Sequence, residues 1–327
     1  MFYLKYRPQT VDEIDNSHVR DTIKKLLATT GAVPHAMLFV GHKGTGKTSV
    51  ARIVAKHLNQ LKSVNDSSDI VEMDAASNRG IDEIKSLIKE ASFLPMTGNY
   101  RVFIIDEAHM ITTEAFNALL KTLEEPPETA IFILATTNVE KVPKTIVSRA
   151  QIINFGRAKA EDVLHMLQRI CEKEKIQIDD DTLRLIIEHS DFSFRDAAKI
   201  LEELTIQNKL TYKEAEDYLG VSGRANFLLI LEKNDVKATL TWIETFIQEG
   251  GSTKNLLETL LNQLRILLLT KSGVETSQPA VTSTLTLKDV STLIRLFSEA
   301  YNMLKISPIE SLPLEIAVTD FYNSKHV

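Results

Sequence analysis

The chain has 327 residues, of which 43% are hydrophobic and 25% are charged, and its formal net charge is −6 at pH 7. These fractions are those of an ordinary folded protein with two or three domains, and they exclude a disordered or collagen-like chain. The acidic balance excludes binding to nucleic acid through overall charge, so any DNA contact must come from a local surface or an assembly.

The first half of the chain alternates apolar strands with amphipathic helices. Residues 36–40 are a short apolar run that predicts a buried strand, and residues 49–58 carry apolar side chains at helical spacing. Further strands are expected at 69–73, 100–106, 130–135 and 152–155, with helices at 81–91 and 114–124. Alternation of this kind predicts a parallel sheet flanked by helices, an α/β fold.

Beyond about residue 157 the strand pattern ends, and only helices are predicted. The first four are expected at 162–173, 181–190, 194–207 and 212–219, and five more at 225–232, 235–248, 253–271, 287–304 and 310–321. We therefore predict an α/β domain at 1–156, an all-α domain at 157–221 and a second all-α domain at 222–327.

Cysteine content and hydropathy indicate the compartment. The single cysteine, Cys171, excludes an intramolecular disulfide and a cysteine-based zinc site, and it fits a reducing cytoplasm. The N-terminus shows no apolar core of a signal peptide. The most apolar stretch, residues 256–269, carries Glu258, Asn262 and Arg265, so it predicts a core helix. We expect a cytoplasmic protein without membrane contact.

Residues 41–48, GHKGTGKT, fit the phosphate-binding loop GxxxxGK[ST] at every fixed position. Glycines let backbone N–H groups turn toward an anionic phosphate chain, Lys47 supplies a charge for the β- and γ-phosphates, and the Thr48 hydroxyl can hold Mg²⁺. The strand before the loop and the helix after it place a helix N-terminus on the phosphate. The expected nucleotide-binding residues here are Gly41, Gly44, Thr45, Gly46, Lys47, Thr48 and Ser49.

Asp106 and Glu107 end a predicted strand and supply the acidic pair expected opposite the phosphates. Asp106 is expected to hold Mg²⁺, directly or through water, and Glu107 to polarise the attacking water. Hydrolysis is the expected reaction, since no acceptor site other than water is evident. The alternative is two surface acids at a strand end. Residues 106–109, DEAH, also spell a helicase signature, but such helicases need a second α/β domain that the helical residues after 157 do not supply.

Three further residues gain meaning only from the architecture. Thr137 follows the strand at 130–135, which places a hydroxyl near the γ-phosphate. Arg149 and Arg195 are weak signals in isolation, because surface arginines are common. A hydrolysing site gains greatly from an arginine that meets transition-state charge.

Several segments, taken in order, resemble one family. They are YRPQT at 6–10, the phosphate loop, DAASN at 74–78, IIDEAHM at 104–110, NALLKTLEEPP at 117–127, LATT at 134–137, SR at 148–149 and FRDA at 194–197. Together they resemble the gamma/tau ATPase subunits of the bacterial DNA polymerase III clamp loader, which are AAA+ proteins. The resemblance is dense over residues 3–205 and thins after 222.

The resemblance implies an AAA+ domain at 1–156, a lid at 157–221 and an oligomerisation collar at 222–327. It implies that Thr137 is sensor 1 and that Arg195 is sensor 2, touching ATP in its own subunit.

The remaining roles concern catalysis, the adenine and DNA. Catalysis is expected from Lys47, Glu107 and Arg149, with Arg149 as an arginine finger that reaches the ATP site of a neighbouring subunit. Arg7, with Tyr6 and Pro8, is expected by the adenine. The residues expected to face the DNA backbone are Asn78, Arg79 and Lys85.

The implied function is ATP-driven loading of the sliding clamp onto primer–template DNA, with ATP and Mg²⁺. The implied partners are delta, delta-prime and further gamma copies in a hetero-oligomer in the bacterial cytosol, associated with the nucleoid. One departure is that residues 59–69 contain no cysteine, so the zinc module usual in the family is absent.

Four alternatives stay open. They are a delta-prime-like stator, an archaeal or eukaryotic small-subunit loader, an AAA+ motor that translocates on DNA junctions, and a scaffold that binds ATP without hydrolysing it. The intact phosphate loop and acidic pair favour the hydrolysing subunit over the stator.

Overall fold

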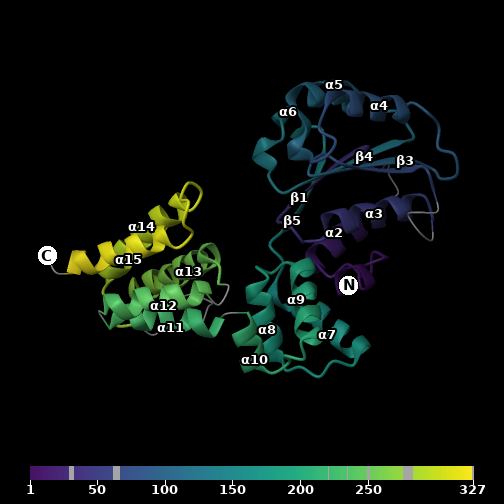
Figure 1. Ribbon diagram of the computed structural model, residues 1–327. Coiled ribbons are helices and arrows are strands. Elements are labelled where there is room, and N and C mark those ends of the chain that lie inside the picture. Colours follow the sequence, from purple (N-terminus) through teal and green to yellow (C-terminus); the bar gives the residue numbers. More distant parts are fainter. Residues whose placement is uncertain are drawn as a thin grey trace. The chain divides into compact units, whose positions relative to one another are not determined.

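The computed structural model describes residues 1–28, 33–61, 67–219, 221–233, 235–248, 251–274 and 283–325. Among them the chain forms two compact units, residues 1–212 and 213–327, whose helices and strands are labelled in Figure 1. Every strand of the described residues lies in the first unit.

The first unit is built on one five-stranded sheet in the order β2-β3-β4-β1-β5, in which every pair of neighbours is parallel. The strands are β1 (Ala36–Gly41), β2 (Ile70–Asp74), β3 (Arg101–Asp106), β4 (Ala130–Thr136) and β5 (Gln151–Gly156). All residues of β4 are buried, because a parallel strand covered on both faces carries an unbroken apolar run. The segments that follow β1, β3 and β4 meet at one edge of the sheet, where parallel α/β proteins bind their ligands.

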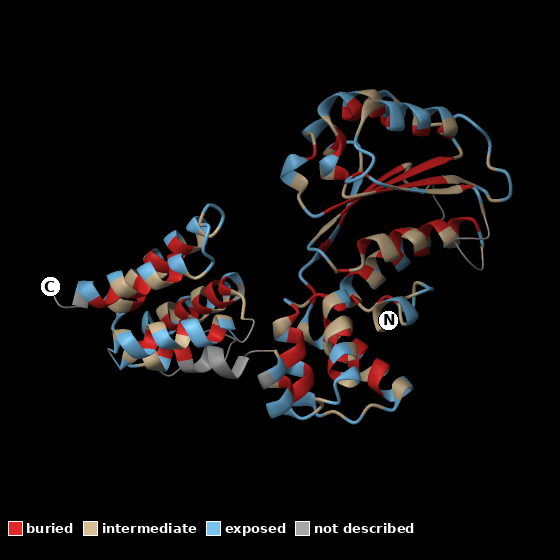
Figure 2. Ribbon diagram, viewed as in Figure 1, coloured by how far each residue is buried: buried red, intermediate tan, exposed pale blue. Residues whose placement is uncertain are grey.

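Helices cover both faces of the sheet (Figure 1). Two of them, α2 (Ser17–Ala28) and α3 (Lys47–Leu58), pack on one face, and α4 (Ile81–Ala91) and α5 (Thr113–Glu124) pack on the other. Figure 2 shows buried residues along the strands and on the helix faces turned toward them. The layers therefore follow directly from the apolar periodicity of these helices.

Alternate residues of the central strands serve the two faces. Ile104 and Ile133 belong to the apolar cluster under α2 and α3. Phe103 and Phe132 belong to the cluster under α4 and α5, and their rings stack with centroids 5.2 Å apart. This alternation is the period of two that a β-strand imposes on its side chains.

Short helices complete the α/β part. They are α1 (Phe2–Lys5), η2 (Ala108–Met110), η3 (Val139–Lys141) and α6 (Lys144–Val147). The sequence patterns predicted none of these, nor α2, in which only Val19 and Ile23 are buried. Its apolar residues Val19, Ile23, Leu26 and Leu27 nevertheless follow helical spacing and pack on one cluster, so the sequence carried a signal for α2 that was missed.

The first unit ends in helices α7 (Ala160–Glu174), α8 (Asp180–His189) and α9 (Phe194–Ile206). Two N-caps fix where α8 and α9 begin: Asp179 accepts from the Thr182 amide at 2.7 Å, and Ser193 accepts from the Asp196 amide at 3.2 Å. A further helix, α10 (Tyr212–Tyr218), follows at the junction of the two units.

The second unit contains α11 (Val221–Glu232), α12 (Val236–Gln248), α13 (Thr253–Lys271), α14 (Leu287–Met303) and α15 (Leu312–Lys325). Its core is one apolar cluster. The Tyr322 hydroxyl, buried in that cluster, lies 2.9 Å from the Thr239 hydroxyl and donates to the carbonyl of Leu231 at 3.1 Å. An aromatic ring with a polar end is thus accommodated without an unpaired group.

The predicted fold class, a parallel sheet flanked by helices and followed by helices alone, is confirmed. The division into domains at 156/157 and 221/222 stays a prediction. Of the predicted cysteine-free linker at 59–69, residues 62–66 lie outside the described residues. In the part of the chain that the structure describes, no helix is both long and apolar enough to cross a membrane.

Candidate nucleotide-binding site

The phosphate loop joins β1 to α3, as predicted. Two of its glycines have positive φ, +76° at Gly44 and +94° at Gly46, which L side chains rarely adopt. A Cβ on Gly44 would also lie 1.9 Å from the Ser193 hydroxyl at the start of α9. Both the backbone conformation and the lack of space for a side chain therefore favour glycine at position 44. The loop amides remain accessible at the N-terminus of α3.

The Lys47 side chain points into the loop. Its ammonium donates to the carbonyls of Gly41 at 2.9 Å and His42 at 2.8 Å, and the residue is only 6% exposed. Burial lowers the pKa of Lys47, whereas the nearby carboxylates of Glu107 and Asp106 raise it. A desolvated cation held here is suited to phosphate oxygens.

Thr48 and Asp106 meet across the sheet edge, although they lie on different elements. The Thr48 hydroxyl donates to Asp106 Oδ2 at 2.6 Å, and Asp106 Oδ1 accepts from the amide of Glu107 at 2.9 Å. A hydroxyl and a carboxylate are hard oxygen ligands of the kind that Mg²⁺ prefers. Among the described residues no group of three or more His, Cys, Asp or Glu could hold a metal, and Mg²⁺ commonly uses one or two carboxylates together with substrate phosphates.

Glu107 adopts an unusual backbone conformation, φ +48° and ψ +43°, at the turn between β3 and η2. Its Oε2 accepts from the Thr137 hydroxyl at 3.2 Å and lies 3.4 Å from His109 Nδ1. Left-handed backbone at a non-glycine residue is strained and is concentrated at functional sites. The structure thus brings the two predicted residues Glu107 and Thr137 together.

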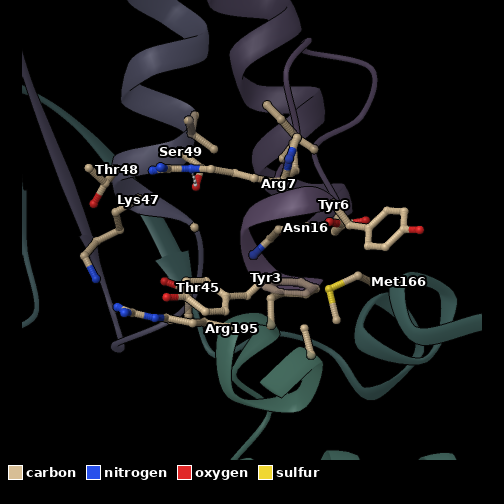
Figure 3. Close-up of a pocket in the computed structure, with 18 of the residues that line it drawn as sticks. Tyr3, Tyr6, Arg7, Asn16, Thr45, Lys47, Thr48, Ser49, Met166 and Arg195 are labelled. Atoms are coloured by element: carbon tan, nitrogen blue, oxygen red, sulfur yellow. Dashed lines mark hydrogen bonds between the residues drawn. The ribbon is translucent and has the colours of Figure 1, made fainter. Parts of the chain in front are cut away.

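A cavity of about 420 Å³ adjoins the loop (Figure 3). From the predicted site it includes Arg7, Lys47, Asp106, Glu107 and Arg195. Arg7 donates through Nε to the Ser49 hydroxyl at 2.8 Å. The loop, the acidic pair and two arginines from distant parts of the chain therefore surround one space.

Arg195, on α9, lies over the ring of Tyr3, with its guanidinium carbon 5.1 Å from the ring centroid. Lys199, one turn later, lies 5.4 Å from the same centroid. Stacking on an aromatic face restrains the guanidinium at the cavity wall, where Figure 3 shows Arg195 beside Tyr3 and Thr45.

One wall of the cavity was not predicted from the sequence. It is formed by side chains from the N-terminal segment and α7, including Tyr3, Ile14, Asn16, Met166 and Ile170. No motif marks them; the only local signal is the aromatic content of the first six residues. The wall exists because the N-terminal segment is tied to the helices: Tyr6 donates to Glu174 Oε1 at 2.7 Å, for example.

Asp15 also lines this wall. Arg169, on α7, lies 2.9 Å from its carboxylate, whose side chain is 8% exposed. Burial is the largest effect and raises the pKa of Asp15 to about 6, with Arg169 acting in the opposite direction. The charged form is therefore costly even in an ion pair.

Arg149 is not among the residues that line the cavity. It follows α6, donates to the Thr145 carbonyl at 2.8 Å and forms an ion pair with Glu124 at the end of α5. Asn78, Arg79 and Lys85, expected to face DNA, lie exposed before and on α4. The roles predicted for these four residues stay predictions.

Comparison with known proteins gives related sequences. A family model described as DNA polymerase III, delta subunit, matches residues 16–159. The DNA polymerase III subunit gamma of Buchnera aphidicola subsp. Schizaphis graminum is 31% identical over 290 residues, which cover 82% of this chain and 80% of that protein. The subunit tau of Bacillus subtilis is 35% identical over 294 residues, which cover 83% of this chain and 52% of that protein.

The length and the fold can be compared as well. The chain spans about half the length of the tau and gamma/tau relatives that it matches. Among solved structures, the Holliday junction branch migration motor RuvB of Thermotoga maritima is 19% identical, with a TM-score of 0.53 and coverage of 83% of this chain and 86% of that one. At this identity the likeness shows a shared fold alone.

Proposed function

Because the chain belongs to the family of DNA polymerase III gamma/tau subunits, we propose that it is an ATPase subunit of a clamp loader. One observation carries the proposal. The phosphate loop, the acidic pair and Arg195 line a single cavity, with Thr48 bonded to Asp106 at 2.6 Å. A scaffold that merely binds a nucleotide does not require a second polar side chain at the phosphate end, whereas hydrolysis needs a residue that orients the attacking water, and Glu107 can fill that role.

In the proposed mechanism the residues of this chain bind the phosphates and orient and polarise the attacking water. The loop amides and Lys47 hold the phosphates, and Glu107 orients and polarises the attacking water. Thr48 and Asp106 would hold Mg²⁺, which neutralises charge on the phosphate oxygens when bound. Arg195 contacts the nucleotide of its own subunit, and the apolar wall beside Arg7 receives the base.

Arg149 completes the neighbouring subunit's site in this proposal. Its position outside the cavity and the exposure of about a third of its side chain support a role toward another molecule. An arginine supplied in trans makes hydrolysis depend on assembly, because the transition-state charge is neutralised only when subunits are in register. The isolated chain is therefore expected to turn over ATP slowly.

We further propose the partners that the family suggests: delta and delta-prime subunits, further copies of this chain, a sliding clamp and primer–template DNA. ATP binding orders the ring of subunits that opens the clamp, and hydrolysis releases the loader. Such a protein would act in the bacterial cytosol, at the nucleoid. The helices of residues 222–327 supply the collar that holds the subunits together while the ATPase domains move.

The test is ATPase turnover of the purified chain, first alone and then with delta-type subunits, a sliding clamp and primed DNA. Strong stimulation by clamp and DNA together supports the clamp-loader ATPase. Tight ATP binding without turnover in any mixture would contradict it and favour a delta-prime-like stator or a scaffold. Glu107→Gln, which keeps size but loses the charge, controls for contaminating ATPases.

A further inference from the structure

His109 contacts the carboxylate proposed to polarise water. It lies on η2, two residues after Glu107, and its side chain is 14% exposed. Nδ1 lies 3.4 Å from Glu107 Oε2 and 3.2 Å from the hydroxyl of Thr136, the last residue of β4. The ring therefore connects the turn after β3 with the end of β4.

The hydrogen bonds of Thr136 decide which form of the ring is present. Its hydroxyl donates to the carbonyl of Asn138 at 3.2 Å and accepts from the amide of Asn138 at 3.0 Å. Since the single hydroxyl proton is used, Nδ1 can approach only as a donor. A bare nitrogen lone pair would also face the Glu107 carboxylate. We therefore place the ring proton on Nδ1, the tautomer that suits both neighbours.

Both donors near Glu107 approach the same oxygen. Oε2 accepts from the Thr137 hydroxyl at 3.2 Å, and Nδ1 of His109, whose hydrogen bond is to Thr136, lies 3.4 Å from Oε2 as an electrostatic contact. Oε1 accepts no hydrogen bond from any residue that the structure describes. One oxygen is therefore held by the residue that follows β4 and by η2, and the other is left for a further partner.

The backbone holds His109 and Glu107 in a fixed relation. The amide of Met110 donates to the Glu107 carbonyl at 2.8 Å, and that of Ile111 donates to the Ala108 carbonyl at 3.1 Å. Ala108, between them, is fully buried. This hydrogen-bonded turn packs on the core and keeps the imidazole beside the carboxylate in the absence of a nucleotide.

We propose that His109 is a positioning residue for hydrolysis: with Thr137 it fixes Oε2 of Glu107, so that Oε1 faces the attacking water. The inference rests on the proposed ATPase function. It gives a role to His109, the last residue of the DEAH sequence. Without the ring, the Glu107 side chain, which is 32% exposed, samples other rotamers, and fewer encounters with ATP have water and base aligned.

The experiment compares His109→Leu with His109→Asn in the assembled loader with clamp and primed DNA. The Asn amide nitrogen takes nearly the place of Nδ1 and keeps a donor, whereas Leu has similar bulk and no donor. His109→Leu should lower kcat by on the order of tenfold to a hundredfold with the KM for ATP changed less than about threefold. His109→Asn should restore most of kcat.

Two further variants keep the test decisive. Thr136→Val is isosteric but lacks the hydroxyl that accepts from the ring, and it should lower kcat severalfold. This variant is the test if His109→Leu does not fold. His18→Leu, at an exposed histidine of α2, is the matched control and should leave kcat unchanged. In the double variant His109→Leu with Thr137→Val, the losses should be less than additive because both residues hold one oxygen.

The outcomes separate the inference from its premise. If Glu107→Gln abolishes turnover while His109→Leu keeps the wild-type kcat, the positioning role is wrong and the ATPase function stands. Equal losses in His109→Leu and His109→Asn, or a rise in KM with kcat unchanged, would also overturn the positioning role. Absence of turnover in the wild-type assembly would overturn both.

Discussion

The two units of the chain bury different kinds of side chain. Residues 1–212 bury Lys47 and Asp69 as well as polar groups at the sheet edge, whereas the buried polar residues described in 213–327 are Thr239 and Thr253. A buried charge costs free energy unless its partners are in place, so the first unit is organised around binding. The second is organised around apolar contact, which is suited to a collar.

Asp69 shows that not every buried charge of the first unit is part of the site. Its carboxylate accepts from the amides of Met96, Thr97 and Gly98 at 2.7, 2.7 and 2.9 Å. Burial raises its pKa, but these hydrogen bonds outweigh burial and hold the pKa well below its usual range. Asp69 therefore fixes a loop, whereas Lys47, whose hydrogen bonds among the described residues go to loop carbonyls, is available to a ligand.

The largest effect is expected from Arg149→Ala in the assembled loader. If the finger acts in trans, turnover should fall by about 10³-fold or more, while ATP binding and the slow turnover of the isolated chain stay unchanged. Arg184→Ala, at an exposed arginine of α8, is the matched control. An assembly rate equal to that of the control would reject the finger assignment.

Glu107→Gln should lower turnover by on the order of 10²- to 10⁴-fold, the usual contribution of a general base. ATP affinity should change little, because Glu107 faces water and not the phosphates in the proposed geometry. Equilibrium binding of a fluorescent ATP analogue, measured beside single-turnover hydrolysis, separates the two quantities. A parallel loss of affinity would mean that Glu107 holds the nucleotide itself.

Phe297→Ala tests the apolar unit. The ring is fully buried, with its centroid 6.5 Å from that of Phe227, so truncation should cost about 3–5 kcal/mol of the second unit's free energy of unfolding. The sole tryptophan, Trp242, packs on Phe227 and Phe246 with centroids 5.0 and 5.1 Å apart, so its fluorescence reports this unit.

The matched control is Phe297→Leu, which should cost less than Phe297→Ala because the leucine side chain leaves a smaller cavity. ATP affinity should be unchanged in both variants, because the cavity lies within the first unit. Weaker ATP binding in Phe297→Ala but not in Phe297→Leu would show that the stability of the second unit affects the site in the first.

Asp15→Asn should change how stability depends on pH. The pKa of Asp15 is raised to about 6 by burial, so the folded chain binds this proton more tightly than the unfolded chain. The contribution of Asp15 is therefore most favourable below about pH 4 and is lost as pH rises to about 6, a difference of about 3 kcal/mol.

The measurement is amide hydrogen exchange of the first unit for wild type and Asp15→Asn between pH 4 and 7, corrected for intrinsic exchange rates. Their difference in stability should vary with pH. The control is Asp12→Asn: Asp12 is exposed, and its hydrogen bond from Lys24 lowers its pKa, so any effect should be small and of opposite sign. A wild-type-minus-Asp15→Asn difference that is flat with pH would contradict the assignment.

The sequence by itself determined the elements whose signal is local. Periodicity and motif predicted the phosphate loop, the apolar runs of β1, β3 and β4 and the wide apolar faces of α3 to α5. Each of these signals lies within a short segment of the sequence. The acidic pair and Thr137 could be assigned to the same site because parallel strands end at one sheet edge.

Only the tertiary structure decided which residues from distant parts of the chain meet. Ser193 against Gly44, Glu124 with Arg149, and the wall of Tyr3, Asn16 and Met166 join residues far apart in sequence. No local pattern marks such contacts, since their free energy arises only when separate helices pack. The contact of His109 Nδ1 with Thr136 is of the same kind, because that hydroxyl lies at the end of another strand.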